Sequence, residues 1–178
     1  MADVPSVTFR DGNSIPQVGF GVFKIPDEEV VAAVSSALSL GYRHIDTASV
    51  YGNEKGTGAA INASGIAREE LFVTTKLART EMGRDNTFRE FDASLERLGL
   101  DYVDLYLIHW PVPSQDLYVE TWQALLEIRQ SGRARSVGVS NFQIPHLERL
   151  AAETGELPVI NQIELHPFLP PAELRAFH

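Results

Sequence analysis

Short apolar runs alternate with segments of helical periodicity along almost the whole chain, and this alternation restricts the fold more than any other feature. The runs are rich in Val, Ile, Phe and Tyr, as buried strands are. They occupy residues 18–23, 42–45, 71–75, 103–108, 135–139 and 159–165. Repeated strand–helix–strand order requires parallel strands joined by right-handed crossovers, so the sequence predicts an α/β fold.

The segments between these runs have the spacing of amphipathic helices. Their apolar stripes are Val30, Val34 and Leu38; Phe88, Phe91, Leu95 and Leu98; Trp122, Leu125 and Leu126; and Leu147, Leu150 and Ala151. Thr87 with Glu90 three residues later has the form of a capping box, and Pro145 suits a first helical turn. Glycine, which favours helix C-caps, follows the helical segments at Gly41, Gly65, Gly99, Gly132 and Gly155.

The N-terminal region has a different pattern. Asp11 and Gly12 lie between the short apolar stretches 7–9 and 15–18. An Asp-Gly pair in this position predicts a tight β-hairpin, because glycine tolerates a positive φ.

Polar residues at the ends of the apolar runs distinguish two α/β architectures. Asp46, Lys76, His109 and Ser140 each follow a predicted strand, at intervals of 30, 33 and 31 residues. Such a ring is typical of the active-site face of a (β/α)8 TIM barrel. A doubly wound open sheet would instead gather its polar groups at one switch point, usually with a Gly-x-Gly-x-x-Gly turn, and residues 19–24 lack the third glycine. We therefore expect a barrel.

Composition and charge exclude several classes of protein. The 178 residues include no cysteine, which excludes disulfide scaffolds and thiol nucleophiles. A net charge of −9 argues against nucleic-acid or anionic-membrane partners. No apolar run reaches the roughly 18 residues of a membrane span, and the acidic start does not resemble a signal peptide. We expect one cytoplasmic domain, residues 1–178.

Four residues on consecutive predicted units suit carbonyl reduction: Asp46, Tyr51, Lys76 and His109. Protonating a carbonyl oxygen requires an acid, and an ammonium beside a phenol lowers the phenol pKa. A carboxylate would keep the ammonium charged, and an imidazole would orient the carbonyl. The hydride must come from a cofactor. Taken singly, each residue also has a structural explanation: an ion pair, a loop aromatic or a buried histidine.

Several long segments then carry a resemblance to the aldo-keto reductase family. They are residues 41–48, 51–54, 75–77, 104–111, 136–142 and 161–167. Within that family the chain is most similar to bacterial 2,5-diketo-D-gluconate reductases, which reduce ketones and aldehydes with NADPH. The resemblance implies an aldo-keto reductase barrel.

The resemblance also implies roles for individual residues. Tyr51 would be the general acid, Lys76 would lower its pKa, Asp46 would partner Lys76, and His109 would orient the substrate. The remaining residues would contact NADPH or line the substrate pocket: Ser140, Asn141 and Gln162 at the nicotinamide carboxamide, Gly21, Val22 and Phe23 at the mouth, and Trp110 as an apolar wall. The full-length protein would be a monomer without metal.

Two departures from the family pattern have consequences. Ala78 stands where relatives usually carry Trp, which should reshape the substrate pocket. A (β/α)8 barrel typically needs about 250 residues, whereas this chain stops at His178 after six units. We therefore expect a fragment of a longer enzyme or an assembly-dependent remnant, whose open strand edges favour self-association.

Two alternatives to an active reductase remain. A truncated, catalytically inactive remnant would serve as a binding or structural module and would not bind NADPH. A metal-dependent barrel hydrolase would need converging His or carboxylate ligands and would leave the Tyr–Lys pairing unexplained.

Overall fold

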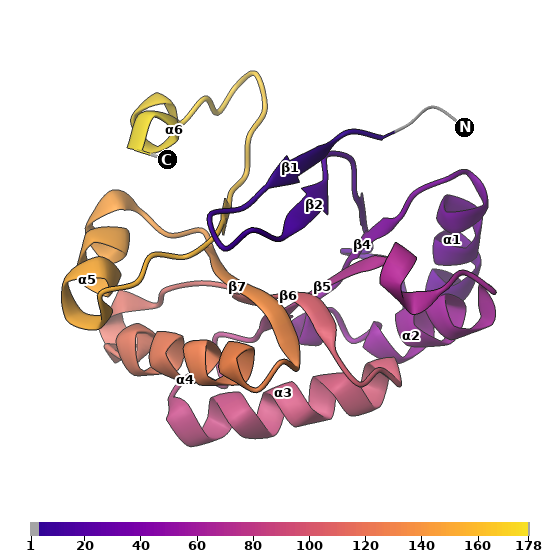
Figure 1. The fold of residues 1–178 in the computed structure, drawn as a ribbon, viewed down its shortest axis with the longest axis horizontal. Coiled ribbons are helices and arrows are strands. Elements are labelled where there is room, and N and C mark those ends of the chain that lie inside the picture. The colour runs from indigo at the N-terminus through magenta and orange to yellow at the C-terminus, as the bar shows by residue number, and fades with distance from the viewer. Residues whose placement is uncertain (1–3, 178) are drawn as a thin grey trace.

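The computed structural model describes residues 4–177 and shows a β-hairpin, a parallel sheet and a layer of helices (Figure 1). Most of the acidic start, residues 1–3, and the final residue, His178, lie outside the described residues. The expectations that depend on those residues are therefore not addressed by the structure.

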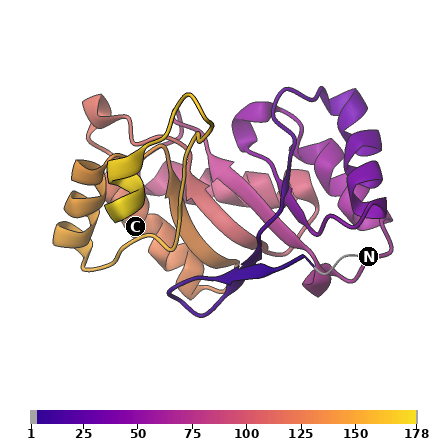
Figure 2. The same cartoon turned by 90° about the horizontal axis from the view of Figure 1, so that it is seen from above.

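The predicted hairpin is confirmed. Its strands are β1 (Ser6–Thr8) and β2 (Ser14–Pro16), which pair antiparallel, and the turn glycine Gly12 has a φ of 88°. The turn is tied to the main sheet, because Asn13 Nδ2 donates to Ser136 Oγ at 3.1 Å and Ser136 Oγ donates to Asp11 Oδ2 at 2.7 Å. The hairpin thus lies across one end of the sheet (Figure 2).

The main sheet has six parallel strands in strictly sequential order, from β3 to β8. They are β3 (Phe20–Gly21), β4 (His44–Asp46), β5 (Phe72–Leu77), β6 (Val103–Ile108), β7 (Ala134–Ser140) and β8 (Asn161–Gln162). A doubly wound sheet reverses its strand order at a switch point. The sequential order therefore confirms the barrel architecture, here a partial barrel in which β3 and β8 are the two edges.

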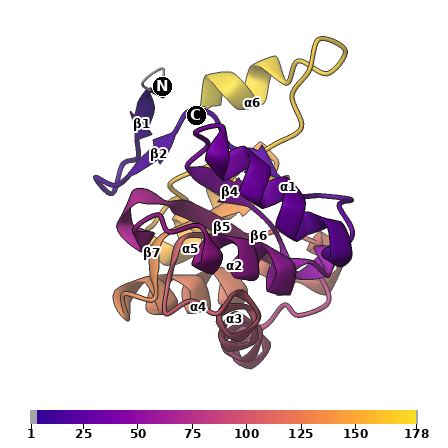
Figure 3. The same ribbon diagram turned by 90° about the vertical axis from the view of Figure 1, so that its right-hand side faces the viewer.

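Helices cover the outer face of the sheet (Figures 1 and 3). They are α1 (Asp27–Ser39), α2 (Glu54–Ala63), α3 (Arg84–Leu98), α4 (Tyr118–Gln130) and α5 (Ile144–Thr154). The short helix α6 (Ala172–Phe177) lies apart from this layer, and the 3-10 turns are η1 (Ser49–Tyr51), η2 (Arg68–Glu70) and η3 (Pro113–Gln115). The apolar stripes point inward as predicted: Phe91, Trp122 and Leu150 are each 0% exposed. They pack with outward-facing strand residues such as Val137 into the larger core.

A smaller core lies between the hairpin and the face of the sheet opposite the helices. Phe9 from the hairpin packs with Phe72, Leu105 and Leu107, and Ile15 lies against them. Successive strand residues face opposite sides of a sheet. Leu105 and Leu107 therefore occupy the barrel interior while their neighbour Tyr106 belongs to the outer core.

The predicted boundaries of three elements are wrong. Helix α3 begins at Arg84, with Gly83 as its N-cap, so Thr87 lies inside the helix and its Oγ1 donates to the Gly83 carbonyl at 2.7 Å instead of forming a capping box. The early start is supported by Thr121, whose Oγ1 accepts from the Gly83 N–H at 2.9 Å. The runs predicted as strands at 18–23 and 159–165 shorten to β3 and β8, because each edge strand has one neighbour.

Candidate active site

Strand register brings the polar ends of the strands to one end of the sheet. Asp46 is paired with Gly21 on β3 and Thr74 on β5, and Ser140 is paired with Gln162 on β8. Because parallel strands end at the same edge, side chains that are about 30 residues apart in sequence become neighbours.

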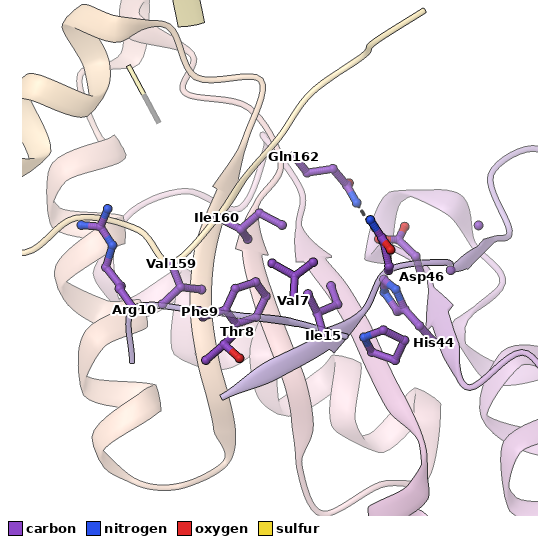
Figure 4. A pocket seen from close by; sticks show the side chains of 14 residues that line it. Val7, Thr8, Phe9, Arg10, Ile15, His44, Asp46, Val159, Ile160 and Gln162 are labelled. Carbon is purple, nitrogen blue, oxygen red and sulfur yellow. Dashed lines mark hydrogen bonds between the residues drawn. The ribbon is translucent and has the colours of Figure 1, made fainter. Parts of the chain in front are cut away.

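Asp46 and Lys76 form a buried ion pair. Lys76 Nζ lies 2.5 Å from Asp46 Oδ1 and also donates to the Thr47 carbonyl at 2.9 Å. The Lys76 residue is 1% exposed. The second carboxylate oxygen of Asp46 accepts from Gln162 Nε2 at 2.8 Å, a bond drawn in Figure 4. The pair predicted from the sequence is thus present, with Gln162 as a further partner.

Tyr51 ends the η1 turn and lies over this pair. Gly52 follows with a φ of 70°, which reverses the chain after the aromatic ring. Lys76 Nζ lies 5.3 Å from the centroid of the Tyr51 ring, and the His109 ring centroid lies 5.7 Å from it, edge to face. Asp46, Tyr51, Lys76 and His109 are therefore gathered in one place.

Asn53, to which the sequence analysis gave no role, anchors the loop that holds Tyr51. Its side chain is buried, accepts from Thr47 Oγ1 at 2.9 Å and donates to the carbonyls of Val22 and Ile25, each at 2.9 Å. These bonds connect the loop after β3 with the loop after β4. The loop after β3 includes Phe23, whose ring lies 4.9 Å from that of Tyr51.

The pKa of Tyr51 differs from the prediction. Burial and the Asp46 carboxylate raise the pKa of Tyr51 to about 12, whereas the sequence analysis expected Lys76 to lower it. The physical reason is that Asp46 contacts Lys76 directly and offsets its positive charge, while burial penalises the phenolate. The phenol is consequently protonated at neutral pH.

Burial also changes the titration of the two neighbouring bases. Burial, reinforced by the charge of Lys76, lowers the pKa of His109 to about 4, so the imidazole is neutral at pH 7. Burial lowers the pKa of Lys76 as well, and Asp46 opposes that change. The site thus offers a protonated phenol and a neutral imidazole.

Ser140, Asn141 and Gln162 form a polar cluster beside the ion pair. Ser140 Oγ donates to the Gln162 carbonyl at 2.9 Å, and Asn141 Nδ2 donates to the His109 carbonyl at 2.9 Å and to Ser140 Oγ at 3.0 Å. Among residues 4–177, no donor contacts the side-chain oxygens of Asn141 and Gln162. Two amide oxygens are thus free to accept from a carboxamide.

Two cavities adjoin these groups. The larger, about 690 Å³, is lined by Gly21, His44, Asp46 and Gln162 together with the hairpin (Figure 4). The smaller, about 300 Å³, is lined by the aromatic and polar residues Phe23, Val50, Tyr51, Arg79, His109, Trp110 and Asn141. Phe23 and Trp110 are placed as predicted, whereas the Val22 side chain is buried in the core and lines neither cavity. Arg79 was not anticipated.

Residues 4–177 contain no group of three or more His, Cys, Asp or Glu side chains arranged to hold a metal ion. In the same residues, no helix is both long and apolar enough to cross a bilayer.

Comparisons with known proteins agree with this geometry. Methylglyoxal reductase DkgA of Salmonella typhimurium is 50% identical over the whole chain, which spans 64% of that protein's length. An aldo/keto reductase from Brucella melitensis superposes with a TM-score of 0.96 at 58% identity, covering 99% of this chain and 69% of its own. A Bombyx mori aldo-keto reductase solved in complex with NADP superposes with a TM-score of 0.92 at 43% identity, covering 99% and 63%.

The family model of the aldo/keto reductases matches residues 17–178. The fold is accordingly the aldo-keto reductase barrel in part, with six parallel strands and the N-terminal hairpin. The chain belongs to the aldo/keto reductase family.

Proposed function

We propose that this chain carries the catalytic half of an NADPH-dependent oxidoreductase that reduces aldehydes and ketones to alcohols. Its substrates would be small dicarbonyl compounds or compounds of the 2,5-diketo-D-gluconate type. The observation that supports the proposal most directly is the convergence of Tyr51, His109 and the Asp46–Lys76 ion pair beside one cavity. Family membership and the similarity to a methylglyoxal reductase support it independently.

The residues present fit a nicotinamide. The free side-chain oxygens of Asn141 and Gln162 suit the N–H donors of a carboxamide. Gly21 leaves room for close approach, because a Cβ built there would meet nothing within 4 Å. We assign carboxamide recognition to Ser140, Asn141 and Gln162. NADPH, when bound, supplies the hydride that reduces the carbonyl carbon.

The remaining chemistry falls to the side chains of this chain. The protonated Tyr51 donates its phenolic proton to the carbonyl oxygen as negative charge develops there. Lys76, whose Nζ lies 5.3 Å from the Tyr51 ring centroid, attracts the phenolate that is left and partly offsets the unfavourable effects of burial and Asp46. The neutral His109 donates a hydrogen bond to the same oxygen and fixes its direction. Asp46 keeps Lys76 charged in a site where burial favours the neutral amine.

The proposal includes the setting of the reaction. We assign the enzyme to the cytoplasm, as a monomer when full-length, with a small-molecule carbonyl substrate and neither nucleic acid nor membrane as a partner. The net charge of −9 supports the last point, since phosphate surfaces repel such a protein.

Replacing Tyr51 by Phe tests the mechanism. The variant keeps the ring packing against Phe23 and His109 but removes the proton donor, so turnover of methylglyoxal with NADPH should fall by about 10²- to 10⁴-fold. NADPH affinity, measured by fluorescence titration, should stay within about twofold. Tyr42→Phe is the matched control, because that ring packs on Phe20 away from the ion pair. Equal turnover in Tyr51→Phe and the parent chain would exclude Tyr51 as the acid.

A second candidate is a catalytically inactive module with a reductase-like surface. The observation that favours it is the open sheet, in which β3 and β8 each have a single neighbouring strand among residues 4–177. An NADPH titration separates the two, because the inactive module predicts no saturable binding, whereas the reductase predicts a defined dissociation constant.

A further inference from the structure

Arg79 lies two residues after the end of β5, the strand that carries Lys76, at the first central position of a tight turn. The Glu81 N–H donates to the Ala78 carbonyl at 3.0 Å, which closes the turn and fixes the backbone on both sides of Arg79. Ala78 is buried at 8% exposure, while Arg79 is exposed. The turn therefore presents a long cationic side chain from a fixed backbone at the rim of the site.

The guanidinium of Arg79 is unpaired within residues 4–177, where none of the ion pairs includes it, although the chain has an excess of acidic residues. The acid of the same turn, Glu81, pairs with Arg89 at 3.3 Å. The next arginine along the chain, Arg84, pairs with Glu127 at 2.5 Å. Arg79 is thus available to an incoming anion.

Arg79 faces the reacting groups rather than bulk solvent alone. It lines the same 300 Å³ cavity as Tyr51, His109 and Trp110. Its charge also reaches the imidazole, where it adds to the larger effects of burial and Lys76 in lowering the pKa of His109. Phe23 and Trp110 supply the apolar walls of this cavity.

We propose that Arg79 is a specificity-determining residue that favours carbonyl substrates bearing a carboxylate over neutral carbonyl compounds. The inference rests on the proposed function and names the substrate class of that same site. Tyr51 and His109 would hold the carbonyl oxygen, and the fork of the guanidinium would hold the carboxylate in two parallel hydrogen bonds. The apolar walls would cover the carbon chain between the two groups.

A binding experiment tests this without requiring turnover. The probes are glyoxylate and 4-oxobutanoate, each measured beside its neutral methyl ester. Trp110, which is 49% exposed in the cavity wall, reports binding by fluorescence, while Trp122 is 0% exposed in the outer core. Trp110→Phe should abolish the signal and thereby place it in this cavity.

The parent chain should bind at least one acid about tenfold more tightly than its ester. Arg79→Gln should remove that preference and leave ester affinity within about twofold of the parent value. Arg79→Lys should retain part of the preference for the acid. Arg84→Gln makes the same change in net charge away from the cavity and should behave as the parent. Where the chain turns over, the ratio of kcat/KM for acid and ester should follow the same order.

Three results would overturn the inference: equal affinity of the parent for acids and esters, an unchanged preference in Arg79→Gln, or the same loss in Arg84→Gln. The anion bound by Arg79 could be a phosphate of the cofactor or the carboxylate of the substrate. An NADPH titration distinguishes these two. Unchanged NADPH affinity in Arg79→Gln supports the substrate assignment, and weakened NADPH binding with intact acid preference contradicts it. Failure of the proposed function itself would appear as full turnover in Tyr51→Phe, a separate measurement.

Discussion

His44 is a buried base on the same face of β4 as Asp46, two residues away, and both line the larger cavity (Figure 4). Its Nε2 lies 3.0 Å from Thr74 Oγ1, and its ring fills the space that a side chain at Gly19 would occupy, 2.4 Å from a Cβ built there. Burial lowers the pKa of His44 from 6.5 to about 4, an effect that Asp46 opposes. The folded protein therefore holds this imidazole neutral.

The lowered pKa of His44 makes the stability depend on pH. Between pH 6.5 and 4 the unfolded chain binds a proton at this residue and the folded chain does not, so the free energy of unfolding falls as the pH falls through that window. The full contribution is about 3 kcal/mol. Urea denaturation at pH 7 and pH 4.5 should show the loss, and His44→Leu should show a smaller one. An identical pH dependence in both proteins would contradict the assignment.

The residues of the site could be identified from the sequence, but the balance of charge among them could not. Asp46, Lys76 and His109 each follow a predicted strand, Tyr51 lies in the loop after Asp46, and parallel strands bring such positions together. The pKa of Tyr51 depends instead on the 2.5 Å contact between Asp46 and Lys76 and on burial. Neither the distance between Asp46 and Lys76 nor the burial of Tyr51 can be predicted from a pattern in the sequence.

Helix α2 shows how tertiary contacts override a weak local preference. Gly56 and Gly58 lower its helix propensity. Glu54, buried at its first residue, accepts from Thr75 Oγ1 at 2.5 Å and Arg97 Nε at 2.6 Å, which attaches the helix to β5 and α3. No apolar stripe predicted α2, because most of its buried residues (Gly56, Thr57, Gly58 and Ala60) are small and allow a close helix–helix approach.

Gly58 marks the closest point of that approach. A Cβ built at Gly58 would lie 2.0 Å from the Leu98 carbonyl oxygen, a backbone atom that moves only with α3. Gly58→Ala should therefore destabilise the fold by about 2 kcal/mol or more, despite the higher helix propensity of alanine. The exposed neighbour Ala59 gives the control: Ala59→Gly should cost about 1 kcal/mol from propensity alone. Chemical denaturation of both variants measures the difference, and a stabilised Gly58→Ala would refute the contact.

We expect the open sheet to promote association of this chain. Within residues 4–177, β3 and β8 each pair on one side only, and unpaired edges promote association between chains. Sedimentation velocity should show association that increases with protein concentration. Val18, 48% exposed beside β3, offers a test, because Val18→Lys places a charge at the edge and should weaken association. Val31→Lys, on the outer helix α1, should leave association unchanged; equal effects of the two variants would exclude edge pairing.

Most of the architecture of the whole molecule could be predicted from the sequence. The alternation of strands and helices, the hairpin at Gly12 and the regular spacing of polar strand ends all survive in the structure. The lengths of the two edge strands were overestimated. Apolar runs such as 159–165 indicate burial, but they do not indicate whether a neighbouring strand is present to pair with.

The hydrogen bond from Gln162 to Asp46 joins residues that are 116 positions apart in the chain. Closing so long a loop is entropically costly, and contacts of high sequence separation are typically slow to form. The ion pair of Asp46 and Lys76 needs only β4 and β5 to be paired. The hydrogen bond from Gln162 to Asp46 also requires β8 to be in place. We therefore expect the charged pair to form before its bond to Gln162, which requires β8 to pair with β7.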